Sequence, residues 1–494
     1  MLDNSTICAL ATPISTPAAL AIIRISGFQA HQIVSKIFRS TSKAPLLPRR
    51  TYFGGIFDGE RLIDQALVHT SAAPSSFTGE DTAEINCHGS PYITQEIMRL
   101  LIEAGASPAL PGEFSKRAFL NGKMDLAQAE AIADLIASQS EAAHRLSIQQ
   151  MRGGFSKEIS HLRSSLVDFA SLLELELDFG EEDVAYANRD QLRNLVEHVL
   201  HTVESLCKSF SLGNVLKNGV PVAIIGATNV GKSTLLNALL HDERAIVSDI
   251  HGTTRDTIEE EIALEGIRFR FIDTAGLRES KEEIEQLGIE RSYQKIRSAS
   301  LLLLVLDATR PELFQEQIHQ VAAQIDIQAQ QVIIIVNKYE IINKEEAFYN
   351  DNVIMCNANV INYITRIDND LISKIIEIIP KKQTTFYAIT RISAKHQLGI
   401  ASLQTLLVSA IRTRFDAANL TSDSVLVTNL RHLHALQEAQ KALSRVRDGL
   451  TTLLPTDLIV QDLRQALYDL GNITGDVTTE EILGNIFEKF CIGK

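Results

Sequence analysis

The middle of the chain alternates continuous apolar runs with amphipathic segments. Between residue 218 and about residue 412, the apolar runs have the length of strands, and helix-like segments separate them. A strand that is apolar along its whole length is buried on both faces, so this pattern predicts an α/β domain with a mostly parallel sheet covered by helices. The five expected strands are Val222–Ile225, Phe269–Ile272, Leu301–Leu306, Val332–Val336 and Ala388–Ile392.

Helical patterns flank this α/β region on both sides. Leu126, Ala129 and Ile132 recur at three-residue spacing, and Leu436 and Leu443 are seven residues apart. Two helical segments around an α/β domain predict that the α/β domain is inserted into one all-α domain.

The start of the chain differs, because short β-rich runs and turns mix there and predict an α+β domain with its own sheet. Near the end, Thr478 and Glu481 have the spacing of a capping box, which predicts that a last helix begins at Thr478. The expected domain boundaries are 1–122 (α+β), 123–216 (helical, first part), 217–415 (inserted α/β domain) and 416–494 (helical, second part).

Composition narrows the class of protein. The 494 residues agree with roughly three domains. No apolar stretch approaches the ~18 residues of a membrane helix, and Asp3 stands where a secretory signal would carry a basic residue, so we expect a soluble cytoplasmic protein. The net charge of −14 argues against binding nucleic acid through the overall field. The five cysteines are scattered, which disfavours a disulfide framework or a zinc site.

A phosphate-binding loop follows the first expected strand of the α/β domain. Residues 226–233 read G-A-T-N-V-G-K-S, which fits G-x-x-x-x-G-K-[ST], and a helix pattern follows directly. The glycines let the backbone wrap phosphates at a helix N-terminus, Lys232 should reach the β- and γ-phosphates, and Ser233 should bind Mg²⁺. The nucleotide contacts expected from this loop are Asn229, Val230, Gly231, Lys232, Ser233 and Thr234.

Further sequence elements follow the phosphate-binding loop in the order that is typical of GTPases, and they favour GTP over ATP. Asp273, Thr274, Ala275 and Gly276 form a D-x-x-G element directly after a strand, and Thr254 in the preceding polar loop is the expected second Mg²⁺ ligand.

The guanine elements come later in the chain. Asn337, Lys338 and Glu340 resemble the guanine-binding N-K-x-D element with Glu in place of Asp, and Ser393 and Ala394 belong to an S-A-K element. A carboxylate can accept hydrogen bonds from the N1–H and N2–H₂ groups of guanine, and adenine offers no such pair.

The residue that orients the attacking water in many small GTPases is missing. Leu277 stands where those proteins have Gln, so hydrolysis must use another group. Four acidic residues follow, of which at most one is expected to be catalytic: Glu279, Glu282, Glu283 and Glu285.

Blocks near both ends of the chain resemble a specific family, the tRNA-modification GTPases called MnmE or TrmE. The blocks are Ala11-Thr12-Pro13, residues 22–27 (I-I-R-I-S-G), 76–81 (S-F-T-G-E-D), His88-Gly89, 111–126 (P-G-E-F-S-K-R-A-F-L-N-G-K-M-D-L) and 490–494 (F-C-I-G-K). The resemblance covers essentially the full length.

The resemblance implies a specific chemistry. Its N-terminal domain would dimerise and bind 5-formyl- or 5,10-methylene-tetrahydrofolate through Arg24, Glu84, Lys123 and Lys494. Together with an FAD-dependent partner, MnmG (GidA), such a protein adds aminomethyl-type groups to C5 of the wobble uridine of certain tRNAs. Cys491 resembles a cysteine needed for this modification, although a packed thiol is the alternative.

It also implies a K⁺-dependent GTPase whose G domains meet across the ion. K⁺ would be bound by Asn229, Ser248, Ile250 and Thr253, within a loop that also supplies Asp249, His251 and Gly252 to the nucleotide. Glu285 aligns with the acid thought to orient the water. The chain departs from the family pattern in the glycine-free segment 13–20, at Glu340, and in the long segment 341–385, which we interpret as a surface insertion.

Two alternatives belong to other classes. A ribosome-assembly GTPase shares the nucleotide elements but would carry a basic RNA-binding module, and we find no KH-type Gly-x-x-Gly loop with basic flanks. The second alternative is a folate-dependent one-carbon enzyme whose nucleotide domain has lost its activity. It is disfavoured because Lys232, Ser233 and Asp273 are all present.

Overall fold

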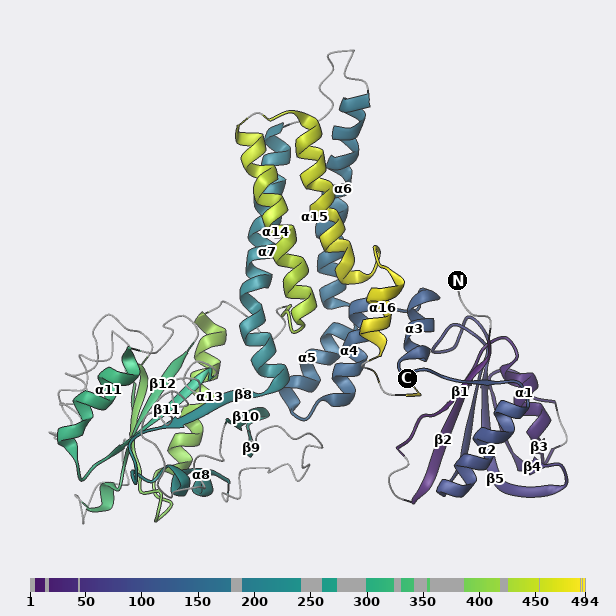
Figure 1. Cartoon of the computed structure of the whole chain (residues 1–494), viewed down its shortest axis with the longest axis horizontal. Coiled ribbons are helices and arrows are strands. Elements are labelled where there is room, and N and C mark those ends of the chain that lie inside the picture. Colours follow the sequence, from purple (N-terminus) through teal and green to yellow (C-terminus); the bar gives the residue numbers. More distant parts are fainter. Residues whose placement is uncertain are drawn as a thin grey trace. The chain divides into compact units, whose positions relative to one another are not determined.

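The computed structural model (Figure 1) describes residues 5–13, 17–42, 45–178, 189–240, 260–272, 299–323, 330–341, 353–355, 386–417, 425–452, 454–488, 490 and 492–493. The chain forms two compact units. The first comprises Met1–Ala137, Ser147–Val203 and His434–Lys494, and the second comprises Ser138–Leu146 and Glu204–Leu433. Each unit has a seven-stranded sheet of its own.

The sheet of the first unit is antiparallel except at one edge, where β1 and β7 run parallel. Its strand order is β3 (Phe38–Ser40), β4 (Arg50–Asp58), β5 (Arg61–Ser71), β6 (Thr82–Gly89), β2 (Ala18–Ser26), β1 (Ile7–Leu10) and β7 (Ser107–Pro108).

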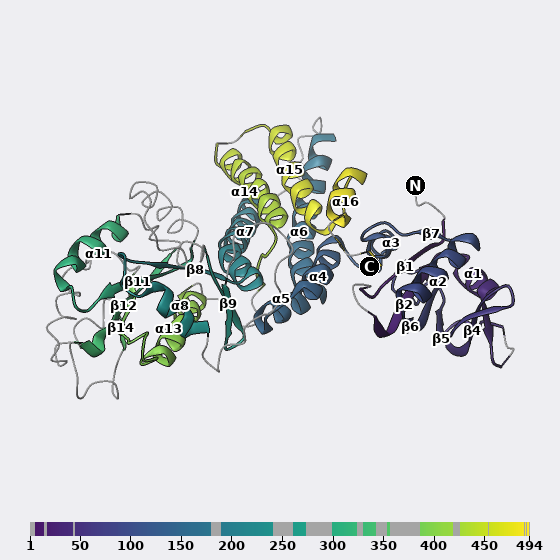
Figure 2. The same ribbon diagram turned by 60° about the horizontal axis from the view of Figure 1, so that its bottom comes forward.

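Two helices, α1 (Ala30–Ile37) and α2 (Pro91–Glu103), pack on one face of this sheet (Figures 1 and 2). Side chains alternate between the faces of a strand, so Ile23 and Ile25 of β2 enter the core with Ile85 of β6. The same alternation sends Arg24 to the other face. Because Arg24 and Glu84 are register partners on β2 and β6, the sequence places an opposite-charge pair side by side there.

A helical part completes the first unit. It contains α3 (Glu113–Leu120), α4 (Leu126–Ala137), α6 (Gly154–Asp178), α15 (Thr456–Thr474) and α16 (Glu480–Phe487), with α6 packed along α15. Further helices of the chain are α5 (Glu141–Met151), α7 (Arg189–Asn218) and α14 (Leu430–Thr451).

The last helix joins sequence-distant segments within this unit. Leu483 and Phe487 of α16 are buried against Leu126 and Ala129 of α4. The helix does not begin where the capping box predicts. Thr479 is the N-cap, and its hydroxyl accepts a hydrogen bond from the Ile482 amide, so the prediction of a start at Thr478 is wrong by one residue.

The sheet of the second unit is parallel in its five central strands and has an antiparallel strand at each edge. Its strand order is β13 (Val353–Met355), β14 (Phe386–Arg391), β12 (Gln331–Asn337), β11 (Leu301–Asp307), β8 (Val220–Ile225), β10 (Ile267–Phe271) and β9 (Glu260–Leu264). All five predicted strands are present.

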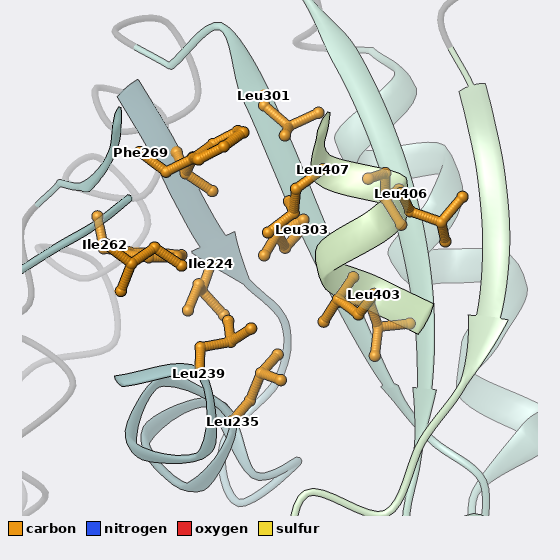
Figure 3. Close-up of a cluster of buried hydrophobic side chains, with 14 of the residues drawn as sticks. Ile224, Leu235, Leu239, Ile262, Phe269, Leu301, Leu303, Leu403, Leu406 and Leu407 are labelled. Carbon is orange, nitrogen blue, oxygen red and sulfur yellow. The ribbon is translucent and has the colours of Figure 1, made fainter. Parts of the chain in front are cut away.

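Helices cover both faces of this sheet. On one face, α8 (Lys232–Leu240) and α13 (Ile400–Ala417) pack on the strands, and Figure 3 shows the side chains of Leu235, Phe269 and Leu403 in this cluster. On the other face, α11 (Phe314–Ala322) buries Phe314 and Ile318. The strands β11 and β12 are therefore apolar on both faces, as their sequences predict.

The predicted fold class is confirmed: an α+β domain, an all-α part and an α/β domain with a mostly parallel sheet. The exact boundaries at residues 122, 216 and 415 stay a prediction. Among the helices that the structure describes, none combines the length and apolar character needed to cross a bilayer.

Candidate functional site

The phosphate-binding loop connects β8 to α8 through a backbone path that requires glycine. Gly226 has φ 149° and Gly231 has φ 98°. A Cβ atom at Gly226 would lie 2.4 Å from the Val305 carbonyl oxygen, and one at Gly231 would lie 2.3 Å from Asn337 Nδ2. Real side chains do not fit at such distances, so both positions need glycine for conformation and for space.

Lys232 begins α8, and its side chain folds back over the loop. The ammonium donates hydrogen bonds to the carbonyl oxygens of Gly226 at 2.9 Å and Ala227 at 2.8 Å. Ser233 and Thr234 follow in the first helical turn and are exposed. The loop, the helix N-terminus and the cation together form a site suited to phosphates and to a hydroxyl-bound Mg²⁺.

Asn337 joins three of the sequence motifs in one place. At the end of β12, its side-chain amide donates to the Val230 carbonyl oxygen at 2.8 Å, and its side-chain oxygen accepts from the Ala394 amide at 3.0 Å. The phosphate-binding loop, the N-K-x-E element and the S-A-K element therefore meet at Asn337. Asn337 and Ala394 are both buried.

Glu340 carries an unsatisfied acceptor in this region. It lies in a short 3₁₀ turn, η3 (Tyr339–Ile341), one residue after the strand β12. Its Oε2 atom is buried and accepts no hydrogen bond from the described residues. A buried carboxylate oxygen without a donor is unfavourable, so this atom fits a ligand that brings N–H groups, which the guanine edge does.

Two charged residues that the motifs do not contain hold this turn. Asp307, at the end of β11, lies 2.6 Å from Lys338 Nζ. Arg391, at the end of β14, is buried, donates to the Tyr339 hydroxyl at 3.2 Å and stacks over the Tyr339 ring at 5.1 Å from its centroid. Sequence reasoning missed both roles, because only strand register brings these residues together.

The first unit contains a second candidate site around Arg24. Its guanidinium contacts Glu84 Oε1 at 2.9 Å through Nε and at 2.8 Å through Nη2. The same guanidinium lies 5.4 Å from the Phe77 ring centroid and 5.8 Å from that of Phe114, within cation–π range. Its Nη1 atom is 3.5 Å from the carbonyl oxygen of Gly493.

This second cluster places a cation and an acid beside an aromatic ring. Arg24 and Glu84 supply hydrogen-bond donors and acceptors, and the Phe77 ring is partly exposed, whereas Phe114 is fully buried. Sequence reasoning missed the two phenylalanines as contacts of Arg24, although both lie in quoted blocks. Lys123, the third predicted folate residue, donates to the Pro74 carbonyl oxygen at 2.8 Å.

The remaining predicted residues lie outside the described residues, and the predictions for them are untested. They are Ser248, Asp249, Ile250, His251, Gly252, Thr253, Thr254, Asp273, Thr274, Ala275, Gly276, Glu285, Cys491 and Lys494.

The parallel sheet, the glycine-dependent loop with Lys232, and the Asn337 bridge define a P-loop domain of the GTPase class. A family model described as "MnmE helical domain" matches residues 126–491, and one described as "GTP-binding protein TrmE N-terminus" matches residues 6–123. The chain belongs to the MnmE/TrmE family of tRNA modification GTPases.

Full-length relatives agree with this assignment. The chain is 46% identical to a tRNA modification GTPase MnmE of Christiangramia forsetii, with 99% of each chain covered. It is 45% identical to a protein of the same name from Bacteroides thetaiotaomicron, with 100% of each chain covered.

Proposed function

We propose that this protein is a GTP hydrolase that drives modification of the wobble uridine of certain tRNAs, in the cytoplasm. The observation that carries the guanine specificity is the buried Oε2 of Glu340, which has no hydrogen-bond partner among the described residues. It lies in the turn that follows Asn337, whose side chain donates to the phosphate-binding loop. Family membership over the full length supports tRNA as the substrate.

In the proposed site, Gly226–Ser233 bind the phosphates of GTP, and Lys232 exchanges its loop carbonyl partners for phosphate oxygens. Ser233 and Thr254 would hold Mg²⁺, which supplies charge neutralisation on the phosphates. Asp273 and Gly276 would complete the γ-phosphate contacts, and Glu285 would orient the attacking water.

A K⁺ ion is the proposed substitute for an arginine finger. Asn229 has φ 64° and is exposed at the tip of the loop, and no described residue forms a hydrogen bond with its side chain. This side-chain oxygen is available to a cation, with Ser248, Ile250 and Thr253 as the other proposed ligands. A cation there stabilises the negative charge that develops on the phosphates.

The Arg24 cluster is the proposed folate site, with Glu84, Lys123 and Lys494. The folate would supply the one-carbon unit, an FAD-dependent MnmG partner would act with this chain, and the N-terminal domain would form the homodimer. The Arg24–Glu84 pair beside the partly exposed Phe77 ring supports this assignment, because it offers a cation, an acid and aromatic surface together.

The experiment that tests the function compares Lys232→Ala with the unaltered protein. We expect the variant to lose GTP hydrolysis in vitro. In a strain that lacks the chromosomal copy, we expect it to leave the wobble uridines unmodified by mass spectrometry. Lys441→Ala is the matched control, since Lys441 lies on α14 and pairs only with Glu438 among the described residues. Normal modification with Lys232→Ala would refute the proposal.

Hydrolysis should depend on the monovalent cation. We expect faster GTP turnover in KCl than in NaCl at matched ionic strength, because the smaller Na⁺ fits poorly among ligands spaced for K⁺. Asn229→Lys should remove this difference by placing an ammonium at the ion's position. Equal turnover in the two salts, or K⁺ stimulation that survives in Asn229→Lys, would rule out the proposed ion site.

A further inference from the structure

Lys338, between Asn337 and the turn that contains Glu340, has an unusual backbone conformation. Its φ is 61°, in the left-handed region that few residues other than glycine adopt. Such a residue is retained where its surroundings hold it in place. The conformation matters here because it sets the direction in which the chain leaves β12 and enters the η3 turn.

Asp307 supplies the contact that holds Lys338. Its Oδ2 atom lies 2.6 Å from Lys338 Nζ, while its Oδ1 atom accepts from the Thr309 amide at 3.0 Å and from the Thr309 hydroxyl at 2.6 Å. The Asp307 side chain is 9% exposed and that of Lys338 is 32% exposed, so water screens this ion pair only in part. Asp307 is thus a fixed anchor.

Strand register places this anchor beside the guanine element. Asp307 and Asn337 are register partners at the ends of β11 and β12, and the Ala308 amide donates to the Asn337 carbonyl oxygen at 2.9 Å. On the far side, Tyr339 is buried at 2% exposure against Arg391. The turn that carries Glu340 is therefore held from both neighbouring strands.

We propose that Asp307 is a positioning residue for guanine recognition. Through Lys338 it fixes the η3 turn, so that the Glu340 carboxylate can accept both the N1–H and the N2–H₂ group of guanine. The proposal rests on the proposed function. Glutamate has one more rotatable bond than aspartate, so a carboxylate on this longer arm depends more on a fixed backbone.

Inosine diphosphate separates positioning from a merely structural role. It has the N1–H donor of guanine and lacks the 2-amino group, so the ratio of GDP to IDP affinity reports the second hydrogen bond to Glu340. A general loss of domain order lowers the affinity for both nucleotides by the same factor. A misplaced carboxylate lowers the affinity for GDP more and reduces the ratio.

The experiment measures GDP and IDP binding to the full-length chain by calorimetry, with ADP as reference. We expect Asp307→Asn to reduce the GDP/IDP ratio about fivefold, the value of part of one charged hydrogen bond. Glu340→Ala should bring the ratio close to one, and the double variant should show no further change. Asp307→Glu keeps the negative charge, so its GDP/IDP affinity ratio should lie closer to that of the unaltered protein than the ratio of Asp307→Asn does. This second variant decides the question if Asp307→Asn lowers the stability of the protein.

Glu265→Gln is the matched control. Glu265 also has a positive φ, 46°, and pairs with Arg412 at 2.7 Å in the same unit. Both side chains of that pair are more than half exposed, at 54% and 63%. Removing this acid should leave the GDP/IDP ratio unchanged.

The outcomes distinguish the proposals. A ratio unchanged in Asp307→Asn, or GDP and IDP affinities that fall by one factor, would overturn the role of Asp307 while the GTPase function stands. A ratio unchanged in Glu340→Ala would overturn the guanine ligand and, with it, the role of Asp307. An unaltered protein that does not prefer GDP to ADP would refute the proposed function itself.

Discussion

At the scale of single residues, the acid of the guanine element differs from the usual aspartate by one methylene group. We expect Glu340→Asp to tighten GDP binding, because the shorter side chain has one rotatable bond fewer to fix on binding. The gain should be about 1 kcal/mol or less, roughly fivefold in affinity. Glu340→Ala should weaken GDP binding and erode discrimination against ADP, measured by calorimetry. An unchanged GDP affinity in Glu340→Ala would show that another residue binds the guanine.

Burial also sets the chemistry of a single thiol. Desolvation raises the pKa of Cys8 from 9.0 to about 11, and Cys8 is fully buried in the core of the first sheet. At pH 9 only about one Cys8 thiol in a hundred is ionised, whereas about half of ordinary thiols are. The alkylation rate of Cys8 in the folded protein should therefore rise about ninefold between pH 9 and pH 10, whereas a thiol with a pKa of 9.0 gains only about twofold, as followed by mass spectrometry. A rise of only about twofold would contradict the raised pKa.

Residues within contiguous motifs could be predicted from the sequence, and their partners could not. Gly231, Lys232 and Asn337 stand at spacings that their chemistry imposes. Asp307 is 31 residues from Lys338, and Arg391 is 52 residues from Tyr339. No local pattern marks these contacts, because they arise from the order and register of the strands.

At the scale of elements, the predictability of a strand follows its burial. Strands β11 and β12 could be predicted because both of their faces are covered, which makes them apolar along most of their length, whereas β10 alternates apolar residues with Arg268 and Arg270. The edge strands β9 and β13 were missed. An edge strand has one neighbour only, and β13 has just three residues, so the sequence carries little periodic signal there.

The start of α16 gives a direct test of capping. Thr479→Ala should lower stability by about 1 kcal/mol, because the Ile482 amide loses its acceptor. Thr478→Ala is the neighbouring control and should change stability by less than about 0.5 kcal/mol, since Thr478 lies outside the helix. Thermal unfolding of both variants measures the difference. A larger effect at Thr478 would favour the capping box read from the sequence.

At the scale of the whole molecule, the phosphate-binding loop and the Arg24 cluster belong to different units of the chain. We expect Cys491→Ser to abolish wobble-uridine modification and to leave GTP hydrolysis within about twofold of normal. The neighbouring Gly493 contacts Arg24 in the first unit, whereas Lys232 belongs to the second. Mass spectrometry of tRNA and a phosphate-release assay measure the two activities, with Cys207→Ser as the control. Full modification in Cys491→Ser would indicate a packed thiol.

The contact between Arg24 and the Gly493 carbonyl has a consequence for biosynthesis. The two residues are 469 positions apart in the chain, and Gly493 lies so close to β1 that a Cβ atom there would be 2.7 Å from the Leu10 carbonyl oxygen. At about 5–20 residues per second, a ribosome needs roughly half a minute to a minute and a half to make the intervening residues. During that time the nascent first sheet lacks the C-terminal residues that contact Arg24 and approach Leu10.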